Sequence, residues 1–488
     1  MAGEDPRRAH RRADSLPRGS GRQPSLSHPA PRPTGGRRGA DAGPTRPVAP
    51  GTAPERRVTA PGCGPTSGVL RPPECSYDRK VWRNQVNPRL FVLTSATFAI
   101  GTDGFLIAGI LPDIARSLDV SPSAAGQLVT LFALAYALLS PVLAAATASW
   151  PRRRLLLTGL AVFVLGNVIV ALAPAYGVAL TGRLVAAVGA AVVTPVATVA
   201  ATALVPPEQR GRALAVVVAG LSAATALGAP LGTAIGAAGH WRVSLWGVAA
   251  LGVVAALGVA TLLPEIPEPP ATKLRQRLAP LRDIRIVTVL STTLFTLTGL
   301  YTVYTYISLS YDRATDGSGN RLALLLVVFG VAATLGNVIA GSLTDRFGAR
   351  RVLTVALLVC VADFALMPWS GAGLPGALVA VAAWGVCGFG VLVPQQHRLI
   401  SVSGAGAPLS IALNATATYL GVGLSGVVGA AGLHLVGAHR LGLISVVFLA
   451  LGLCTAELAH RIIRSREDSA TSAKDAVRVP DAPGESVR

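Results

Sequence analysis

Apolar stretches of about 20 residues recur along this 488-residue chain between Leu90 and Ile463. A helix needs about that length to cross the hydrocarbon core of a bilayer, which is about 30 Å thick. No soluble core requires so many. The pattern therefore predicts an all-α integral membrane protein with twelve transmembrane helices. Their approximate ranges are 90–111, 125–146, 155–173, 178–204, 213–237, 243–263, 286–308, 321–343, 352–368, 375–397, 408–436 and 441–460.

Composition supports the bilayer as the solvent of this chain. Apolar residues make up 51% of the sequence and charged residues only 14%, with a mean hydropathy of +0.54. The formal charge of +19 would suggest a nucleic-acid partner in a soluble protein, but the basic residues lie in short loops and tails beside apolar runs. We expect no nucleic-acid partner. The five cysteines show no disulfide framework or zinc pattern, so we expect no metal and no cofactor.

Basic residues are distributed unevenly between the connections on the two sides of the predicted helices. One set of connections carries fourteen: Arg152, Arg153, Arg154, Arg210, Arg212, Lys273, Arg275, Arg277, Arg282, Arg285, Arg346, Arg350, Arg351 and Arg398. The other set carries five: Arg116, Arg242, Arg313, Arg321 and Arg440. The positive-inside rule places the richer set in the cytoplasm. Because the number of helices is even, we expect a multi-pass protein of the cell inner membrane with both termini cytoplasmic.

The longest internal connection divides the chain into equal halves. The expected parts are a disordered basic Pro- and Arg-rich cytoplasmic tail at 1–88, a six-helix bundle at 89–263, a cytoplasmic linker at 264–284, a second six-helix bundle at 285–463 and a cytoplasmic tail at 464–488. A shift of 197 residues places Phe132 on Phe329 and Arg154 on Arg351. This match indicates duplicated halves, the usual architecture of alternating-access carriers.

The most specific motif lies at the predicted cytoplasmic end of the eighth helix. Its defining residues are Gly341, Asp345, Arg346, Gly348, Arg350 and Arg351. With this spacing the chain resembles the major facilitator superfamily, whose loop motif reads Gly-x-x-x-Asp-Arg-x-Gly-x-Arg-Arg. The resemblance implies two pseudo-symmetric six-helix bundles and a conformational role for the motif, in which Asp345 faces the N-terminus of helix five near Gly211. The N-terminal copy departs from the pattern, with Ala144 and Ala148 in place of Gly and Asp.

A second motif, in the fifth helix, contains Gly228, Pro230 and Gly232. It is similar to the antiporter motif of proton-coupled drug exporters, in which small residues allow close packing and Pro bends the helix. Generic small-residue packing is the alternative explanation. Because uptake members of the superfamily usually lack this Pro-Gly pattern, it favours efflux.

Asp103, Arg183 and Asp363 stand within apolar segments, where charge is costly and usually functional. Asp103 in the first helix is our candidate for proton coupling, with Arg183 of the fourth helix, which matches the superfamily's helix-four Arg motif. The first helix looks like that of the twelve-helix drug:proton antiporters, including chloramphenicol-resistance, purine, nucleoside and arabinose efflux permeases. Many of those carry their acid one place later, where this chain has Gly104. An interfacial position for either charge is the competing interpretation.

Aromatic and amide side chains in the second half are candidates for a substrate cavity. Tyr301 and Tyr304 suit stacking against a flat organic molecule, although an aromatic belt at the interface explains them equally well. Asn337 and Asn414 suit a polar cavity wall, and interhelical hydrogen bonding is the alternative.

These observations favour a secondary active transporter that exports a small organic molecule, a drug or a metabolite, by proton antiport with alternating access. Its expected partners are the small-molecule substrate, protons and the lipid bilayer, and a monomer is the family's default state. A nucleoside, purine or sugar efflux permease is the main alternative. A membrane enzyme is disfavoured because no cluster of Asp or His stands at one membrane face. ATP is not implied, because the sequence has no Gly-x-x-x-x-Gly-Lys-Ser/Thr loop.

Overall fold

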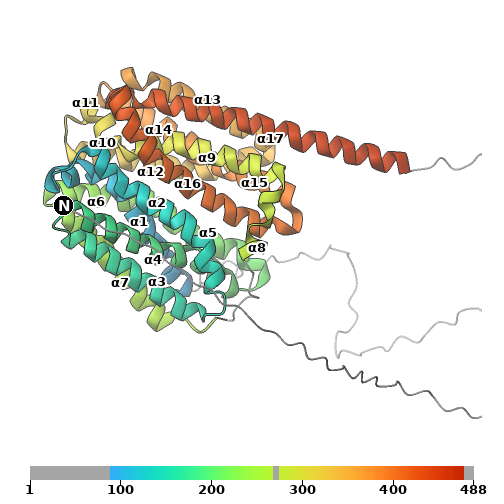
Figure 1. The fold of residues 1–488 in the computed structure, drawn as a ribbon, viewed down its shortest axis with the longest axis horizontal. Coiled ribbons are helices and arrows are strands. Elements are labelled where there is room, and N and C mark those ends of the chain that lie inside the picture. Colours follow the sequence, from blue (N-terminus) through green and yellow to red (C-terminus); the bar gives the residue numbers. More distant parts are fainter. Residues whose placement is uncertain (1–87, 267–273, 478–488) are drawn as a thin grey trace, which may run out of the picture. The chain divides into compact units, whose positions relative to one another are not determined.

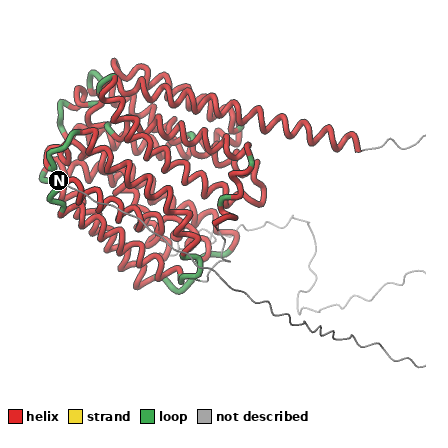
Figure 2. The backbone as a smooth tube through the Cα atoms, viewed as in Figure 1, coloured by secondary structure: helices red, strands yellow, loops and turns green. Residues whose placement is uncertain are grey.

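The computed structural model describes residues 88–266 and 274–477, and within these ranges every regular element is a helix (Figure 2). Twelve helical spans are long and apolar enough to cross a membrane, and each predicted range overlaps one of them. The predicted tail at 1–88, part of the linker at 264–284 and the end of the tail at 464–488 lie outside the described residues.

The first half contains seven α-helices in six spans: α1 (Pro88–Ser117), α2 (Pro122–Ala146), α3 (Arg152–Leu172), α4 (Tyr176–Ala203), α5 (Arg210–Ala223), α6 (Ala229–Ala238) and α7 (Trp241–Leu262). The second half contains α8 (Leu274–Arg277), α9 (Ile284–Thr305), α10 (Ile307–Ser310), α11 (Asp312–Thr315), α12 (Gly319–Phe347), α13 (Ala349–Ser370), α14 (Leu374–Gly390), α15 (Leu392–Ser403), α16 (Ala407–Leu435) and α17 (Leu441–Val477). We call the membrane side at which α1 begins the near side, and the side at which it ends the far side.

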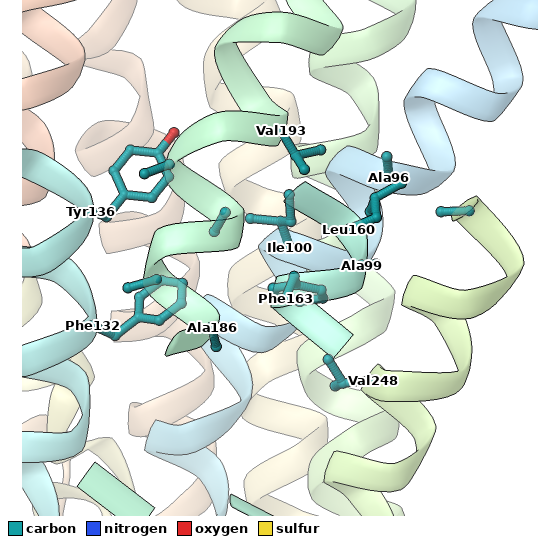
Figure 3. Packing of buried hydrophobic residues seen from close by; sticks show 14 of the residues in the cluster. Ala96, Ala99, Ile100, Phe132, Tyr136, Leu160, Phe163, Ala186, Val193 and Val248 are labelled. Atoms are coloured by element: carbon teal, nitrogen blue, oxygen red, sulfur yellow. The ribbon is translucent and has the colours of Figure 1, made fainter. Parts of the chain in front are cut away.

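The helices form two bundles that lie side by side (Figure 1). Helices α1 to α7 form one bundle, whose core is filled by apolar side chains such as Ile100, Phe163 and Val248 (Figure 3). Helices α9 to α17 form the other, centred on residues such as Leu326 and Trp384. The bundles meet where α2 packs on α16 and where α12 packs on α6. The expected fold of two six-helix bundles is confirmed.

The fifth span is interrupted at the predicted motif. A π-helical turn, Ala224–Gly228, joins α5 to α6, and the Ala229 N–H donates to the Ala224 carbonyl five residues back. Pro230 has no N–H to complete the ordinary bond to Ala226, so the helix widens just before it. The motif therefore produces the local irregularity that its Pro predicts.

Several ends of helices differ from the predicted ranges, and two of the differences change the course of the chain. The seventh span ends at Thr305, because the chain turns at Tyr306 and continues in two short helices, α10 and α11, instead of running to residue 308. The last helix, predicted to end at residue 460, continues as α17 to Val477 and extends past its neighbours (Figure 1).

Candidate functional site

A buried ion pair joins the first and fourth spans. The Nη1 atom of Arg183 lies 2.8 and 2.9 Å from the two carboxylate oxygens of Asp103, and both side chains are fully buried. The structure thus brings the two predicted residues into contact within the first bundle. Neither charged group reaches the surface of the protein.

The surroundings of Arg183 hold the guanidinium in one place. Its Nε donates a hydrogen bond to the Leu128 carbonyl at 3.2 Å, and its Cζ lies 4.2 Å from the centre of the Phe132 ring. Its Nη2 has no hydrogen-bond partner among the described residues. Asp103 therefore provides most of the compensation for a buried positive charge, and a change at Asp103 acts directly on Arg183.

The helix that carries Asp103 is pressed against the fifth span. A Cβ added to Gly228 would overlap the Thr102 hydroxyl, and one added to Gly232 would lie 2.5 Å from Leu106. Glycine at 228 allows this approach without a shift of Thr102, so the predicted motif lets α1 pack closely on the fifth span. Gly104 is different, since a Cβ there would meet no atom within 4 Å. An acid at 104 would face open space, whereas the acid at 103 faces Arg183.

Aromatic side chains form a chamber in the second bundle. Tyr301 and Tyr304 line it together with Phe329, Trp384 and Phe389. The rings of Phe329 and Trp384 lie 4.6 Å apart, and those of Tyr304 and Trp384 lie 6.1 Å apart. The two predicted tyrosines therefore belong to an internal cluster and not to an interfacial belt. The free volume of about 40 Å³ holds only a few water molecules, so an organic molecule requires the chamber to widen.

Phe105 connects the ion pair to the chamber. It follows Asp103 by two residues on α1, and its ring lies 5.6 Å from that of Tyr304 and 6.2 Å from that of Tyr301. The Tyr304 hydroxyl also donates a hydrogen bond of 3.4 Å to the Phe105 carbonyl. A movement of α1 would therefore displace Phe105 relative to Tyr301 and Tyr304, which line the chamber.

The bundles are closed against each other on the far side. Tyr306, fully buried, lies between Gly126 of α2 and Gly429 of α16, where an added Cβ at either glycine would overlap its ring or hydroxyl. Its hydroxyl donates a hydrogen bond of 2.9 Å to the Gly426 carbonyl. Tyr306 is therefore a wedge between the bundles and does not line the aromatic chamber.

The loop motif lies on the near side. Asp345 and Gly211 are both exposed, and Asp345 has no hydrogen bond or ion pair within the part of the chain that the structure describes. Arg350 instead pairs with Glu457 of α17, with Nη2 to Oε2 at 2.6 Å. The contact between Asp345 and helix five stays a prediction, and it concerns a conformation closed on the near side.

The two predicted asparagines occupy different surroundings. Asn414 is buried and accepts a hydrogen bond of 2.7 Å from Thr293, which in turn accepts one of 3.0 Å from Gln395. This network joins α9, α15 and α16. Asn414 therefore makes an interhelical hydrogen bond, as the alternative to a cavity wall predicted. Asn337 is half-buried on α12.

Together these features define a polytopic membrane protein with two bundles, a charged pair inside one and an aromatic chamber inside the other. Within residues 88–266 and 274–477 no group of three His, Cys, Asp or Glu side chains is placed to hold a metal ion. The sequence profile of the Major Facilitator Superfamily matches residues 93–426. The chain belongs to this superfamily of transporters.

Relatives of known sequence cover most of the chain. It is 32% identical over 380 residues to the uncharacterized MFS-type transporter YbcL of Bacillus subtilis, covering 77% of this chain and 95% of that protein. It is 30% identical to the inner membrane transport protein YdhP of Escherichia coli, over 71% of this chain and 89% of the relative. It is 33% identical to the chloramphenicol resistance protein of Streptomyces lividans, over 72% of this chain and 89% of that protein.

Solved structures share the fold at low sequence identity. The nucleoside transporter NupG superimposes with a TM-score of 0.62 at 12% identity, covering 78% of this chain and 99% of that one. A second structure is that of a bacterial homologue of the human lysosomal transporter Spinster in an inward-facing and occupied conformation. It superimposes with a TM-score of 0.63 at 18% identity, covering 76% of this chain and 96% of that one.

Three walls of the chamber, and the α1 residue that contacts it, were not predicted from the sequence. These residues are Phe329, Trp384, Phe389 and Phe105. Aromatic residues form only 5% of the chain, so their positions in the middle of apolar spans, away from the interfaces, were a usable signal.

Proposed function

We propose that this transporter exports a small organic molecule with an aromatic or otherwise flat apolar part, in exchange for protons, by alternating access. The buried Asp103–Arg183 pair carries the proposal. Protonating Asp103 removes the counter-ion of Arg183 in a buried site, which is costly, so proton binding favours a rearrangement of α1 and α4. Phe105 transmits that rearrangement to the chamber that holds the substrate.

In this proposal the near side is the cytoplasm. The near-side connections carry most of the basic residues in loops, among them Arg154, Arg212 and Arg351, which agrees with the positive-inside rule. The described conformation, closed by Tyr306 on the far side, is then the one closed to the outside.

Two kinds of substrate fit an aromatic chamber, and they are separable by experiment. The relative in S. lividans is named for chloramphenicol resistance, which favours drug export. Nucleosides and purines also present a flat ring for stacking. Drug susceptibility and metabolite accumulation should be compared in a pump-deficient host with and without the gene. Increased resistance supports drug export, loss of intracellular nucleosides supports the second candidate, and no change in either contradicts export.

Tyr304 should contribute to substrate affinity. Tyr304→Leu removes one aromatic contact, worth about 0.5 to 1.5 kcal/mol, so we expect a roughly two- to tenfold higher KM for transport with a smaller change in kcat. Trp369→Leu is the control, because Trp369 is 73% exposed on α13, outside the chamber. If the two substitutions changed KM equally, the chamber would not be the place where the substrate binds.

Asp345 should stabilise the conformation that is closed on the cytoplasmic side. An anion near a helix N-terminus is worth about 0.3 to 1 kcal/mol when exposed and up to about 2 when partly buried. Asp345→Asn should therefore increase cytoplasmic labelling of a cysteine introduced at Thr418, which lines the chamber. Asp316→Asn, an exposed acid on the far side, is the control. Unchanged labelling from both sides would argue against the contact.

A further inference from the structure

A groove of about 410 Å³ lies between α12 and α13, in the half of the second bundle near the loop motif. Small residues form its floor, among them Gly336, Ala340 and Gly390, and larger apolar residues such as Leu343 and Val355 form its walls. A Cβ at Gly336 would overlap the backbone of α14, so α12 is pressed onto α14 at the floor. The hollow results from this close packing of small residues.

The groove opens toward lipid and not toward the space between the bundles. Gly330 marks the face of α12 that contacts the other bundle, because a Cβ there would overlap Ala226. Ile339 of the groove wall is nine residues further on, which is about half a turn around the helix, at the opposite face. Val355 on the other wall is 59% exposed. The groove therefore lies on the face of the second bundle that points away from the first bundle.

The end of the groove nearest the loop carries positive charge. Arg351 lines this end and is exposed, and no ion pair to it is found among the described residues. Its neighbour Arg350 is already paired with Glu457. Arg346 lies over the Phe347 ring, with its Cζ 5.1 Å from the ring centre, beside the same end.

The nearby acid does not neutralise this end. Asp345 is two residues from both Leu343 and Phe347, which line the groove, so its side chain projects about 200° around α12 from either. Arg351 and Arg346 are therefore free to attract an anion at the near-side end of the groove.

We propose that this groove is a binding site for an anionic phospholipid of the near-side leaflet, with an acyl chain between α12 and α13 and the phosphate on Arg351. Basic pockets beside transmembrane helices suit anionic headgroups, and each basic residue near the surface contributes about 1 kcal/mol. A neutral zwitterionic lipid fills the apolar part equally well but gains less from two uncompensated arginines. The proposal does not depend on the transported substrate.

Photo-crosslinking tests the site on the full-length protein. The protein is reconstituted in phosphatidylcholine vesicles with a trace of phosphatidylglycerol or phosphatidylcholine that carries a diazirine in one acyl chain, and labelled peptides are mapped. We expect peptides from α12 and α13 to be labelled about thirtyfold more by phosphatidylglycerol, the factor that corresponds to two arginines at about 1 kcal/mol each. Equal labelling by the two lipids would overturn the proposal.

Three variants separate the headgroup contact from general lipid contact. Arg351→Gln should lower the ratio about fivefold, because Arg346 still contributes about 1 kcal/mol, while Arg351→Lys should largely preserve it. Arg154→Gln, at the equivalent position of the first half, should leave the ratio on α12 and α13 unchanged. Val355→Trp should reduce labelling in the groove by both lipids. A ratio that Arg351→Gln does not change would overturn the assignment of the phosphate.

Discussion

Asp103→Asn is expected to reduce proton-driven export to background while substrate binding is retained. The amide keeps the size and polarity of the carboxylate but cannot release a proton. In proteoliposomes, an imposed pH gradient should no longer drive substrate movement, although substrate exchange without a gradient should continue. Full pH-dependent transport by this variant would show that Asp103 is structural and that proton coupling resides elsewhere.

Stability must be separated from coupling in this experiment. Removing one partner of a buried ion pair costs about 3 to 5 kcal/mol, because Arg183 is left without compensation, so the single variant is expected to unfold more readily. Replacing both partners by apolar residues of similar size is often neutral. Asp103→Leu with Arg183→Met should therefore restore thermal stability and still fail to couple. Asp363→Asn, another carboxyl within a span, is the control that keeps gradient-driven transport.

The spans were predictable because the bilayer requires about 20 predominantly apolar residues of every helix that crosses it. The contact between Asp103 and Arg183 was predictable only as a possibility within the first half. Each residue turns a helix by about 100°, so a shift between 103 and 104 decides whether the acid faces Arg183 or open space. That orientation is set by the packing of α1 on Gly228 and Gly232, which depends on two segments far apart in the sequence.

The other walls of the chamber and the far-side wedge escaped prediction for a related reason. The rings of Tyr304, Phe329 and Trp384 come from three different spans, and no local pattern relates them. The loop motif, by contrast, was predictable, because its residues are close together in the sequence and their spacing indicates the family. Its Arg350 nevertheless pairs with Glu457 of the last span, a partner that the motif alone does not specify.

Gly126→Leu is expected to shift the transporter out of the conformation closed on the far side. Even a Cβ at Gly126 overlaps the Tyr306 hydroxyl, and Tyr306 cannot withdraw because Gly429 of α16 lies against the opposite edge of its ring. Overpacking typically costs about 1 to 3 kcal/mol. This energy is imposed only when the bundles meet at the wedge, so the far-side-closed population should fall roughly fivefold to more than a hundredfold relative to the far-side-open one.

The measurement is labelling of a cysteine introduced at Thr418 by a membrane-impermeant thiol reagent added from the far side. Gly126→Leu should increase this labelling and slow transport, because one half of the cycle becomes unfavourable. Gly177→Leu is the matched control: this glycine begins α4 on the same side, and a Cβ there meets no atom within 4 Å. Combining Gly126→Leu with Tyr306→Ala removes the ring that the leucine displaces, so the double variant should close again on the far side. If the single variant labels like the wild type, or the double variant stays open, the contact between Gly126 and Tyr306 does not control closure.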